Sequence, residues 1–289
     1  MRTRQFWREA TLAAGIVLAA PSAFANSLVE SSLRNSSLGQ YYAHLQAQLL
    51  SAGRLRTDAR PYDAPITASG LTNNFAEIAM RHEYGGSGAK PLVRWETPVA
   101  YSVTFGASVG QSQRISDHTV IAETFATIAH ATGHPVHAAR GAANFQVLVV
   151  GQSDLPGVAD HLKRTAPELS RSDLMAIKRM PRNHLCKVIA VPHGDLRQGY
   201  RRVVAIIRAE HAPRMRASCI AEELAQGMGL PNDCESARPS IFNDDEEFAV
   251  LTDHDKMLLR ILYSGHLRSG MRRNEVVPIV SALSSRLAH

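Results

Sequence analysis

Apolar residues recur at helical spacing in the first part of the chain. Within residues 28–50 they recur three or four positions apart, and the pattern ends at Gly53. This spacing places them on one face of a helix. Residues 73–80 predict a second, short helix, and the glycine-rich residues 85–88 predict a flexible link. We therefore expect residues 26–88 to form a helical extension and linker.

After Pro91 the pattern changes to strands and helices in alternation. Alternating or β-branched apolar runs predict strands, with Trp95 inward in the first, over residues 92–105, 144–150, 185–191 and 202–208. Helical spacing predicts helices over residues 117–131, 170–180, 220–229 and 251–263. Ser170 or Ser172 is expected to cap the second of these helices. This order predicts an α+β fold, a mixed sheet with packed helices, in one domain over residues 89–289.

The N-terminus has the pattern of a secretory signal peptide. Arg2, Arg4 and Arg8 precede an apolar run over residues 10–20, and Ala23-Phe24-Ala25 offers a cleavage site before Asn26. The run is too short for a membrane anchor, which needs about 20 apolar residues. We expect residues 1–25 to be removed and the mature chain, without a transmembrane segment, to be periplasmic or secreted.

Charge gives little information about partners. The formal net charge is +6, of which the signal peptide carries two units. A modest positive charge spread along the sequence does not indicate nucleic acid, and we expect no nucleic-acid partner. The partner stays unknown, and a cell-envelope polymer or protein remains open.

An exported chain meets an oxidising compartment, so its three cysteines matter. Cys186 lies in a strand-like run and Cys219 at the start of the helix expected over residues 220–229. A bridge between them would be worth about 3–4 kcal/mol in the chain-entropy description. A bridge from Cys219 to Cys234 would have to reach around that helix, which disulfide geometry disfavours. We favour Cys186–Cys219, although connectivity does not follow from sequence alone.

The stretch from Cys219 to Asp233 has the outline of a metalloprotease helix with its metal ligands exchanged. In the pattern H-E-x-x-H two His ligands lie one helical turn apart with a Glu general base beside the first. Here the same frame contains Glu222, Glu223 and Gln226, and the longer pattern continues with Gly229 and Asn232. Carboxylate and amide groups replace the three imidazoles, so we expect no zinc and no other obligatory cofactor.

Two later segments extend this signature. Ser240-Ile241-Phe242-Asn243-Asp244 is followed by residues 251–263, a run of the form L-T-x-x-D-x-x-L-L-x-x-L-Y. The whole signature, over residues 219–271, resembles the proteobacterial family of unknown function DUF2927. The resemblance implies a zincin-like (metzincin-like) scaffold with a degenerate zinc motif, and it implies no activity.

The chemistry of the site stays open between structure, binding and catalysis. Its oxygen-bearing side chains suit a hard cation such as Ca²⁺, and equally suit turns and helix caps; they are Glu222, Gln226, Asn232, Asp233, Asn243 and Asp244. Glu223 holds the general-base position. Without a metal it would need a second acid, for which Glu222 or Asp244 is available.

We therefore expect an exported cell-envelope protein that is a non-peptidase binding or structural protein. The alternative is a hydrolase of peptide or cell-wall glycan that uses Glu223 as its general acid or base, with Glu222 as its partner.

Overall fold

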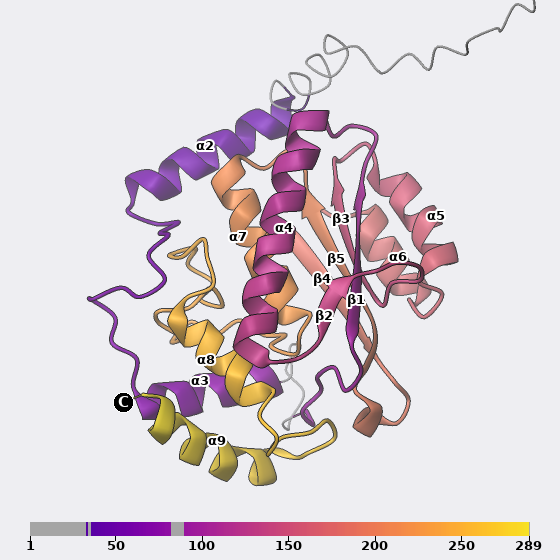
Figure 1. The fold of residues 1–289 in the computed structure, drawn as a ribbon. Helices are drawn as coiled ribbons and strands as arrows, with labels where there is room; N and C mark the ends of the chain where they lie inside the picture. Colours follow the sequence, from indigo (N-terminus) through magenta and orange to yellow (C-terminus); the bar gives the residue numbers. More distant parts are fainter. Residues whose placement is uncertain (1–32, 34–35, 82–89, 289) are drawn as a thin grey trace, which may run out of the picture.

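The computed structural model describes residue 33, residues 36–81 and residues 90–288. In this part of the chain, eight α-helices surround a five-stranded sheet (Figure 1). The strands are β1 (Val99–Phe105), β2 (Val136–Ala138), β3 (Phe145–Val150), β4 (Cys186–Pro192) and β5 (Tyr200–Arg208). The helices are α2 (Ser37–Ser51), α3 (Ala68–Met80), α4 (Gln111–Thr132), α5 (Leu155–Thr165), α6 (Arg171–Lys178), α7 (Pro213–Gln226), α8 (Asp253–Leu262) and α9 (Arg273–Leu287). The expected mixed sheet with packed helices is confirmed.

The strand order is β2-β1-β3-β5-β4. Four strands are parallel, and β4 runs antiparallel to β5 at one edge. The predicted pairing of residues 185–191 with 202–208 is therefore correct. The central strand β3 is buried along its whole length, and its sequence is apolar except for Gln146, which is also buried.

Alternate residues of the central strands face two different hydrophobic layers. Val147 and Val149 lie in the main core with α4 and α7, whereas Leu148 and Val150 pack against α5 and α6. Figure 1 shows α4 and α7 on one side of the sheet and α5 and α6 on the other. This period of two is what a strand covered on both faces produces.

Local signals explain several helix boundaries. Ser170 caps α6, and its side chain and that of Asp173 form a reciprocal capping box. Thr252 and Asp255 form the same arrangement at the start of α8. Gly133 ends α4 in the left-handed conformation (φ 66°), which glycine adopts without a steric penalty.

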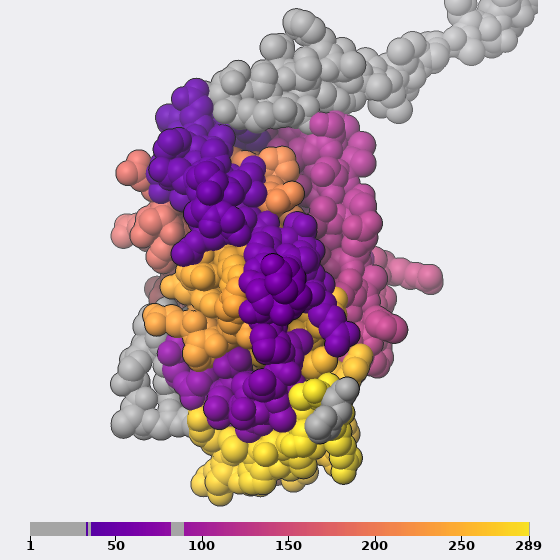
Figure 2. All heavy atoms as spheres, turned by 90° about the vertical axis from the view of Figure 1, so that its left-hand side faces the viewer, coloured from indigo at the N-terminus to yellow at the C-terminus, as the bar shows by residue number. Residues whose placement is uncertain are grey.

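The N-terminal segments pack on the rest of the chain. Phe75 and Ile78 of α3 lie in the same core cluster as the sheet, and α3 lies beside α9 in Figure 1. Tyr42 of α2 is fully buried, and its hydroxyl donates to the carbonyl of Arg182 (2.6 Å). Figure 2 shows these segments running down one face over the C-terminal part of the chain. The expected boundary between residues 88 and 89 thus does not divide the core, because α3 is part of it.

Some predicted boundaries are wrong. The first strand begins at Val99 and not at residue 92, because the N–H of Leu92 donates to Met271 and Trp95 makes only an isolated bridge to Gly199. Helix α4 begins at Gln111, before the predicted residue 117, and α7 covers Pro213–Gln226 in place of 220–229. Strand β2 and helices α5 and α9 have no counterpart among the predicted elements.

Three expectations fall on residues that the structure does not describe. The signal peptide over residues 1–25, its cleavage before Asn26 and the link at residues 85–88 lie outside the described residues. In the described ranges, none of the helices combines the length and apolar character needed to cross a bilayer.

Candidate functional site

Helix α7 carries the central residues of the site, and its first turn is capped from a distant helix. Its N-cap residue Ala212 makes no side-chain hydrogen bond. Oε1 of Gln46 on α2 instead accepts from the backbone N–H groups of Arg214 (2.9 Å) and Met215 (3.1 Å). These are the two groups that a capping side chain normally satisfies. The N-terminal helix therefore stabilises the start of α7.

The other end of α7 is held by the segment before β1 and by α8. The indole N–H of Trp95 donates to the carbonyl of Gly227 (2.9 Å), and the Tyr263 hydroxyl donates to that of Met228 (2.8 Å). Gly229 follows with φ +121°, and a Cβ there would lie 2.6 Å from the Val93 carbonyl oxygen. The glycine of the motif is thus required by backbone conformation and by close packing.

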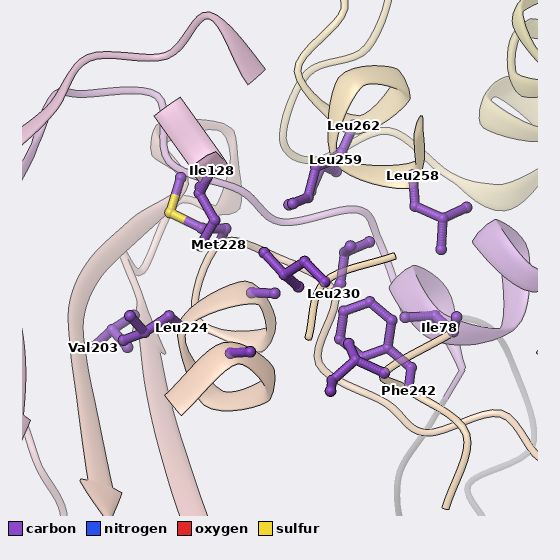
Figure 3. Packing of buried hydrophobic residues seen from close by; sticks show 14 of the residues in the cluster. Ile78, Ile128, Val203, Leu224, Met228, Leu230, Phe242, Leu258, Leu259 and Leu262 are labelled. Carbon is purple, nitrogen blue, oxygen red and sulfur yellow. The ribbon is translucent and has the colours of Figure 1, made fainter. Parts of the chain in front are cut away.

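Apolar residues anchor the same region. In Figure 3, Leu224 of α7 lies beside Val203 of β5, and Met228 lies beside Ile128 of α4. Leu230 and Phe242 pack in the same cluster, between α3 and α8. One side of α7 is therefore fixed in the core, and its acidic side faces the other way.

A cleft of about 830 Å³ lies between the edge strand β4, helix α7 and the turns that follow α7. Six of the predicted site residues line it: Glu222, Glu223, Gln226, Asn232, Asp233 and Asp244. Asn243 is not among the residues that line it, and its backbone N–H bonds to the Ser240 carbonyl (3.4 Å). Asp244 of the same turn lines the cleft, and a binding role for Asn243 stays a prediction.

Gln226 connects two of the carboxylates. Its Nε2 donates to Oε1 of Glu222 (3.4 Å) and to Oδ1 of Asp233 (3.1 Å). The i, i+4 relationship of Glu222 and Gln226 on α7 is as expected for one helical face. Glu223, only 4% exposed, lines the same cleft.

Burial and mutual repulsion favour protonation of two glutamates. Burial, followed by the negative charges of Glu223 and Glu246, raises the pKa of Glu222 well above its ordinary value. Burial and the charges of Asp244 and Asp233 raise the pKa of Glu246 to about 7. Near pH 7 the Glu246 carboxyl is therefore present in both its protonated and its ionised form.

Glu246 is a site residue that the sequence reading missed. It adopts a left-handed backbone (φ 58°), and its carbonyl accepts from the N–H of Leu55 (2.9 Å). The acidic run over residues 244–247 was a usable signal for it. Its conformation was not predictable locally, because non-glycine residues rarely take positive φ.

The two motif segments that follow α7 in the sequence have a structural role. Both oxygens of the Asp255 carboxylate are hydrogen bonded, to Ser240 Oγ (2.5 Å), the N–H of Ile241 (3.0 Å) and the N–H of Thr252 (2.8 Å). This fully buried group joins the turn at residues 240–242 to the start of α8. Phe242, at the same turn, is buried in the core.

A disulfide joins the two walls of the cleft. Cys186 at the start of β4 is bonded to Cys219 of α7, which agrees with the predicted pairing. Cys186 lines the cleft, and Cys219 lies one helical turn before Glu222 and Glu223. Cys234 keeps a free thiol and is buried. The bridge thus fixes the edge strand against the acidic helix.

The donor set does not match a zinc site. Glu222, Gln226 and Asn232 occupy the frame in which a zincin places three imidazoles, and amide oxygens are poor zinc ligands. Within the described ranges, no three His, Cys, Asp or Glu side chains are grouped closely enough to hold a metal ion.

Comparison with known proteins identifies the family and no activity. No curated protein and no solved structure matches the chain. The family model described as "Protein of unknown function (DUF2927)" matches residues 68–282, from α3 into α9, and so includes the sheet and the cleft. The match extends over most of the chain and confirms the resemblance found in the α7 region. The chain belongs to the DUF2927 family.

Proposed function

We propose that this protein is an exported, non-peptidase binding protein whose cleft receives an extended peptide segment of a cell-envelope partner. The observation that carries the proposal is the position of the cleft beside an unpaired sheet edge. Within the described part of the chain β4 pairs only with β5, and Leu185, Lys187, Val188 and Ala190 line the cleft. An extended segment could add to that edge as a further strand.

The chemistry of β4 suits a peptide better than a glycan. In an edge strand about half of the backbone N–H and C=O groups point away from the neighbouring strand and can bond an added strand. Every residue of β4 from Cys186 to Val191 is half-buried, so the strand is packed on one side and open to a binding partner on the other. Gln226, Asn232, Asp233 and Asp244 would contact side chains of the bound segment.

Export is part of the proposal. The signal-like residues 1–25 and the Cys186–Cys219 disulfide both suit a chain that folds in an oxidising compartment.

A zincin-like origin of the scaffold also belongs to the proposal. What supports it is the combination of a five-stranded mixed sheet, a single antiparallel edge strand and a helix after β5 that carries the degenerate motif. In that frame Glu222, Gln226 and Asn232 replace the metal ligands, so the cleft would keep its substrate groove without its metal.

The test uses peptides selected from a random library against the purified protein. Backbone amide NMR shifts should locate the bound peptide along β4 and α7. A peptide of the same sequence with alternate backbone nitrogens methylated cannot pair with an edge strand, and we expect it to lose binding at least tenfold, the factor that corresponds to about 1.4 kcal/mol. Equal binding of the methylated peptide, or shifts confined to another face, would disprove the proposed binding mode.

A second candidate function is hydrolysis of peptide or glycan by a pair of carboxyl groups. The specific observation in its favour is the raised pKa of Glu222 beside Glu223, which gives one protonated acid and one potential base. The test is a panel of peptide and cell-wall glycan substrates with the wild type, Glu223→Gln and Glu222→Gln. A hydrolytic activity that both variants lose without losing thermal stability would favour this candidate over simple binding.

A further inference from the structure

Tyr200, at the start of β5, is fixed in place beside the end of β4. Its ring packs edge-on against the indole of Trp95, with the ring centres 5.9 Å apart. Its backbone N–H donates to the carbonyl of Arg94 (3.0 Å), and in the sheet it is paired with Pro192, the last residue of β4. Tyr200 lines the cleft and is 6% exposed. The position of its side chain is therefore set by the fold before any partner binds.

The hydroxyl of Tyr200 has no hydrogen-bond partner among the described residues. Two other tyrosines show the usual arrangement, because the hydroxyl of Tyr42 donates to the carbonyl of Arg182 (2.6 Å) and that of Tyr263 to the carbonyl of Met228 (2.8 Å). The Tyr200 hydroxyl is also absent from the described side-chain atoms that are sealed off without a partner, so it keeps some surface. The part of Tyr200 that stays accessible lines the cleft. The hydroxyl is therefore available to a group that enters the cleft.

The lining beside Tyr200 is apolar. Four residues of the cleft lining come from the segments that contact it: Val93, Ala190, Pro192 and Leu196. Val93 precedes the residue whose carbonyl accepts from the Tyr200 N–H, and the other three belong to β4 and to its short connection to β5. A side chain that reaches the hydroxyl must therefore pass over apolar surface.

Three cationic side chains line the cleft, and the structure separates them from this hydroxyl. Arg81 donates to the backbone carbonyl of Asp233 (3.0 Å). Lys187 is paired with Ile206, which packs in the layer of α5 and α6, so its side chain lies on the other face of the sheet. Neither Lys90 nor any other charged side chain contributes to the pKa of Tyr200, which burial alone raises.

The spacing of strands limits which side chains of a bound segment can reach Tyr200. A strand added to β4 would lie two strand spacings from β5, about 10 Å away. The small side chain of Ala190, which faces the cleft between them, leaves space above β4. A serine or threonine is too short to cross this distance. A longer side chain, such as that of glutamine or tyrosine, can cross it.

We propose that Tyr200 forms a subsite of the cleft for one long, uncharged side chain of the bound segment, with an apolar stem and a hydrogen-bonding tip, as in glutamine or tyrosine. The inference rests on the proposed function, because that segment supplies the side chain. The stem would pack on Ala190, Pro192 and Leu196, and the tip would bond to the Tyr200 hydroxyl, which can both donate and accept. A charged tip would lose its hydration and gain a single neutral partner, which is unfavourable.

The test compares blocked five-residue peptides that differ only at the central position, in an otherwise alanine and valine sequence. Glutamine is paired with norleucine, and tyrosine with phenylalanine, because the members of each pair are similar in shape. We expect the polar member to bind about threefold to tenfold more tightly in at least one pair, the factor that corresponds to one neutral hydrogen bond. A glutamate peptide should bind more weakly than the glutamine peptide.

Variants assign the preference to the hydroxyl. Tyr200→Phe should abolish the preference for the polar member, and it should leave thermal stability unchanged or higher, since the hydroxyl bonds to no described group. Tyr42→Phe is the matched control. It removes a hydroxyl that donates to the carbonyl of Arg182, so it should lower the melting temperature and keep the preference. A preference that survives Tyr200→Phe would overturn the subsite.

The remaining outcomes separate the subsite from the proposed function. Binding of all peptides along β4 with no preference within either pair would overturn the subsite and leave the proposed function intact. A glutamate peptide that binds more tightly than the glutamine peptide would show that a cation recognises the tip, and would also overturn the subsite. Failure of every peptide to bind would overturn both proposals.

Discussion

The backbone N–H of Leu55 donates to the carbonyl of Glu246 (2.9 Å), and these two residues are the only non-glycine residues of the described ranges with a left-handed backbone. Leu55 is completely buried. It precedes the residues that match the family model, whereas Glu246 lies inside them. A segment from the N-terminal part of the chain therefore sets the conformation of one acid in the cleft.

The left-handed backbone of Glu246 should carry a measurable energetic cost. A side chain at such a position costs roughly 1–2 kcal/mol relative to glycine. We expect Glu246→Gly to be more stable than Glu246→Ala by about 1 kcal/mol, and both variants lack the carboxyl group. Urea denaturation of the two variants measures the difference, and an alanine variant as stable as the glycine variant would contradict it.

The raised pKa of Glu246 predicts a pH dependence of stability. Its pKa rises from 4.5 to about 7 on folding, so between these values the folded protein binds more protons than the unfolded chain. Stability should therefore fall as pH rises through this window. We expect Glu246→Gln to stabilise the protein by about 1–2 kcal/mol at pH 8, since one pKa unit corresponds to about 1.4 kcal/mol and the group is partly exposed.

Denaturation of the wild type and Glu246→Gln at pH 8 and at pH 4 tests this prediction. The gain should disappear at pH 4, where the carboxyl is protonated in both states. A gain of equal size at both pH values would show that the substitution acts through packing and not through charge.

Because Gln46 of α2 caps α7, its substitution should destabilise the protein although it lies far from the cleft residues in sequence. Gln46→Ala leaves the N–H groups of Arg214 and Met215 without their acceptor. Loss of a helix cap costs about 1 kcal/mol. Gln48→Ala, at an exposed position on the same helix, is the control and should change stability by less than about 0.5 kcal/mol. Equal effects of the two substitutions would contradict the capping role.

Removal of the disulfide should lower the free energy of unfolding and loosen the contact between β4 and α7, the two walls of the cleft. Cys186 and Cys219 are 33 residues apart, for which chain entropy predicts a loss of about 3–4 kcal/mol in the double alanine variant. Mass spectrometry after alkylation should find one reactive thiol in the unfolded wild type, that of Cys234, and none in the folded protein, where Cys234 is buried. Three alkylated cysteines in the unreduced, unfolded protein would refute the bridge.

The predictable parts of this fold are those that local chemistry determines. Glu222 and Gln226 share a helical face because they are four residues apart, and Ser170 caps α6 because its hydroxyl reaches the backbone of Asp173. In contrast, α9 contains Pro278 in its interior, and β2 has only three residues, so both give weak sequence patterns. Tertiary packing determines these elements.

In the candidate site, too, some residues follow from local sequence and others depend on tertiary packing. The side chains of α7 could be assigned to the cleft from helical spacing. The position of Glu246 in the cleft could not, because it depends on the bond from Leu55 and on a left-handed backbone. No local rule links Gln46 to α7 either, since the two are brought together only by the packing of α2.

The open edge of β4 is also a point at which copies of the protein could aggregate through their sheets, and the strand limits this. Lys187 places a charge near its start, Pro192 removes a backbone donor at its end, and the pairing with β5 becomes irregular between Val191 and Pro192. Only the four residues Val188 to Val191 remain as a regular apolar run. At the opposite edge of the sheet β2 has three residues. Each edge therefore offers only a short regular stretch for pairing with another copy, which should disfavour edge-to-edge association at high concentration.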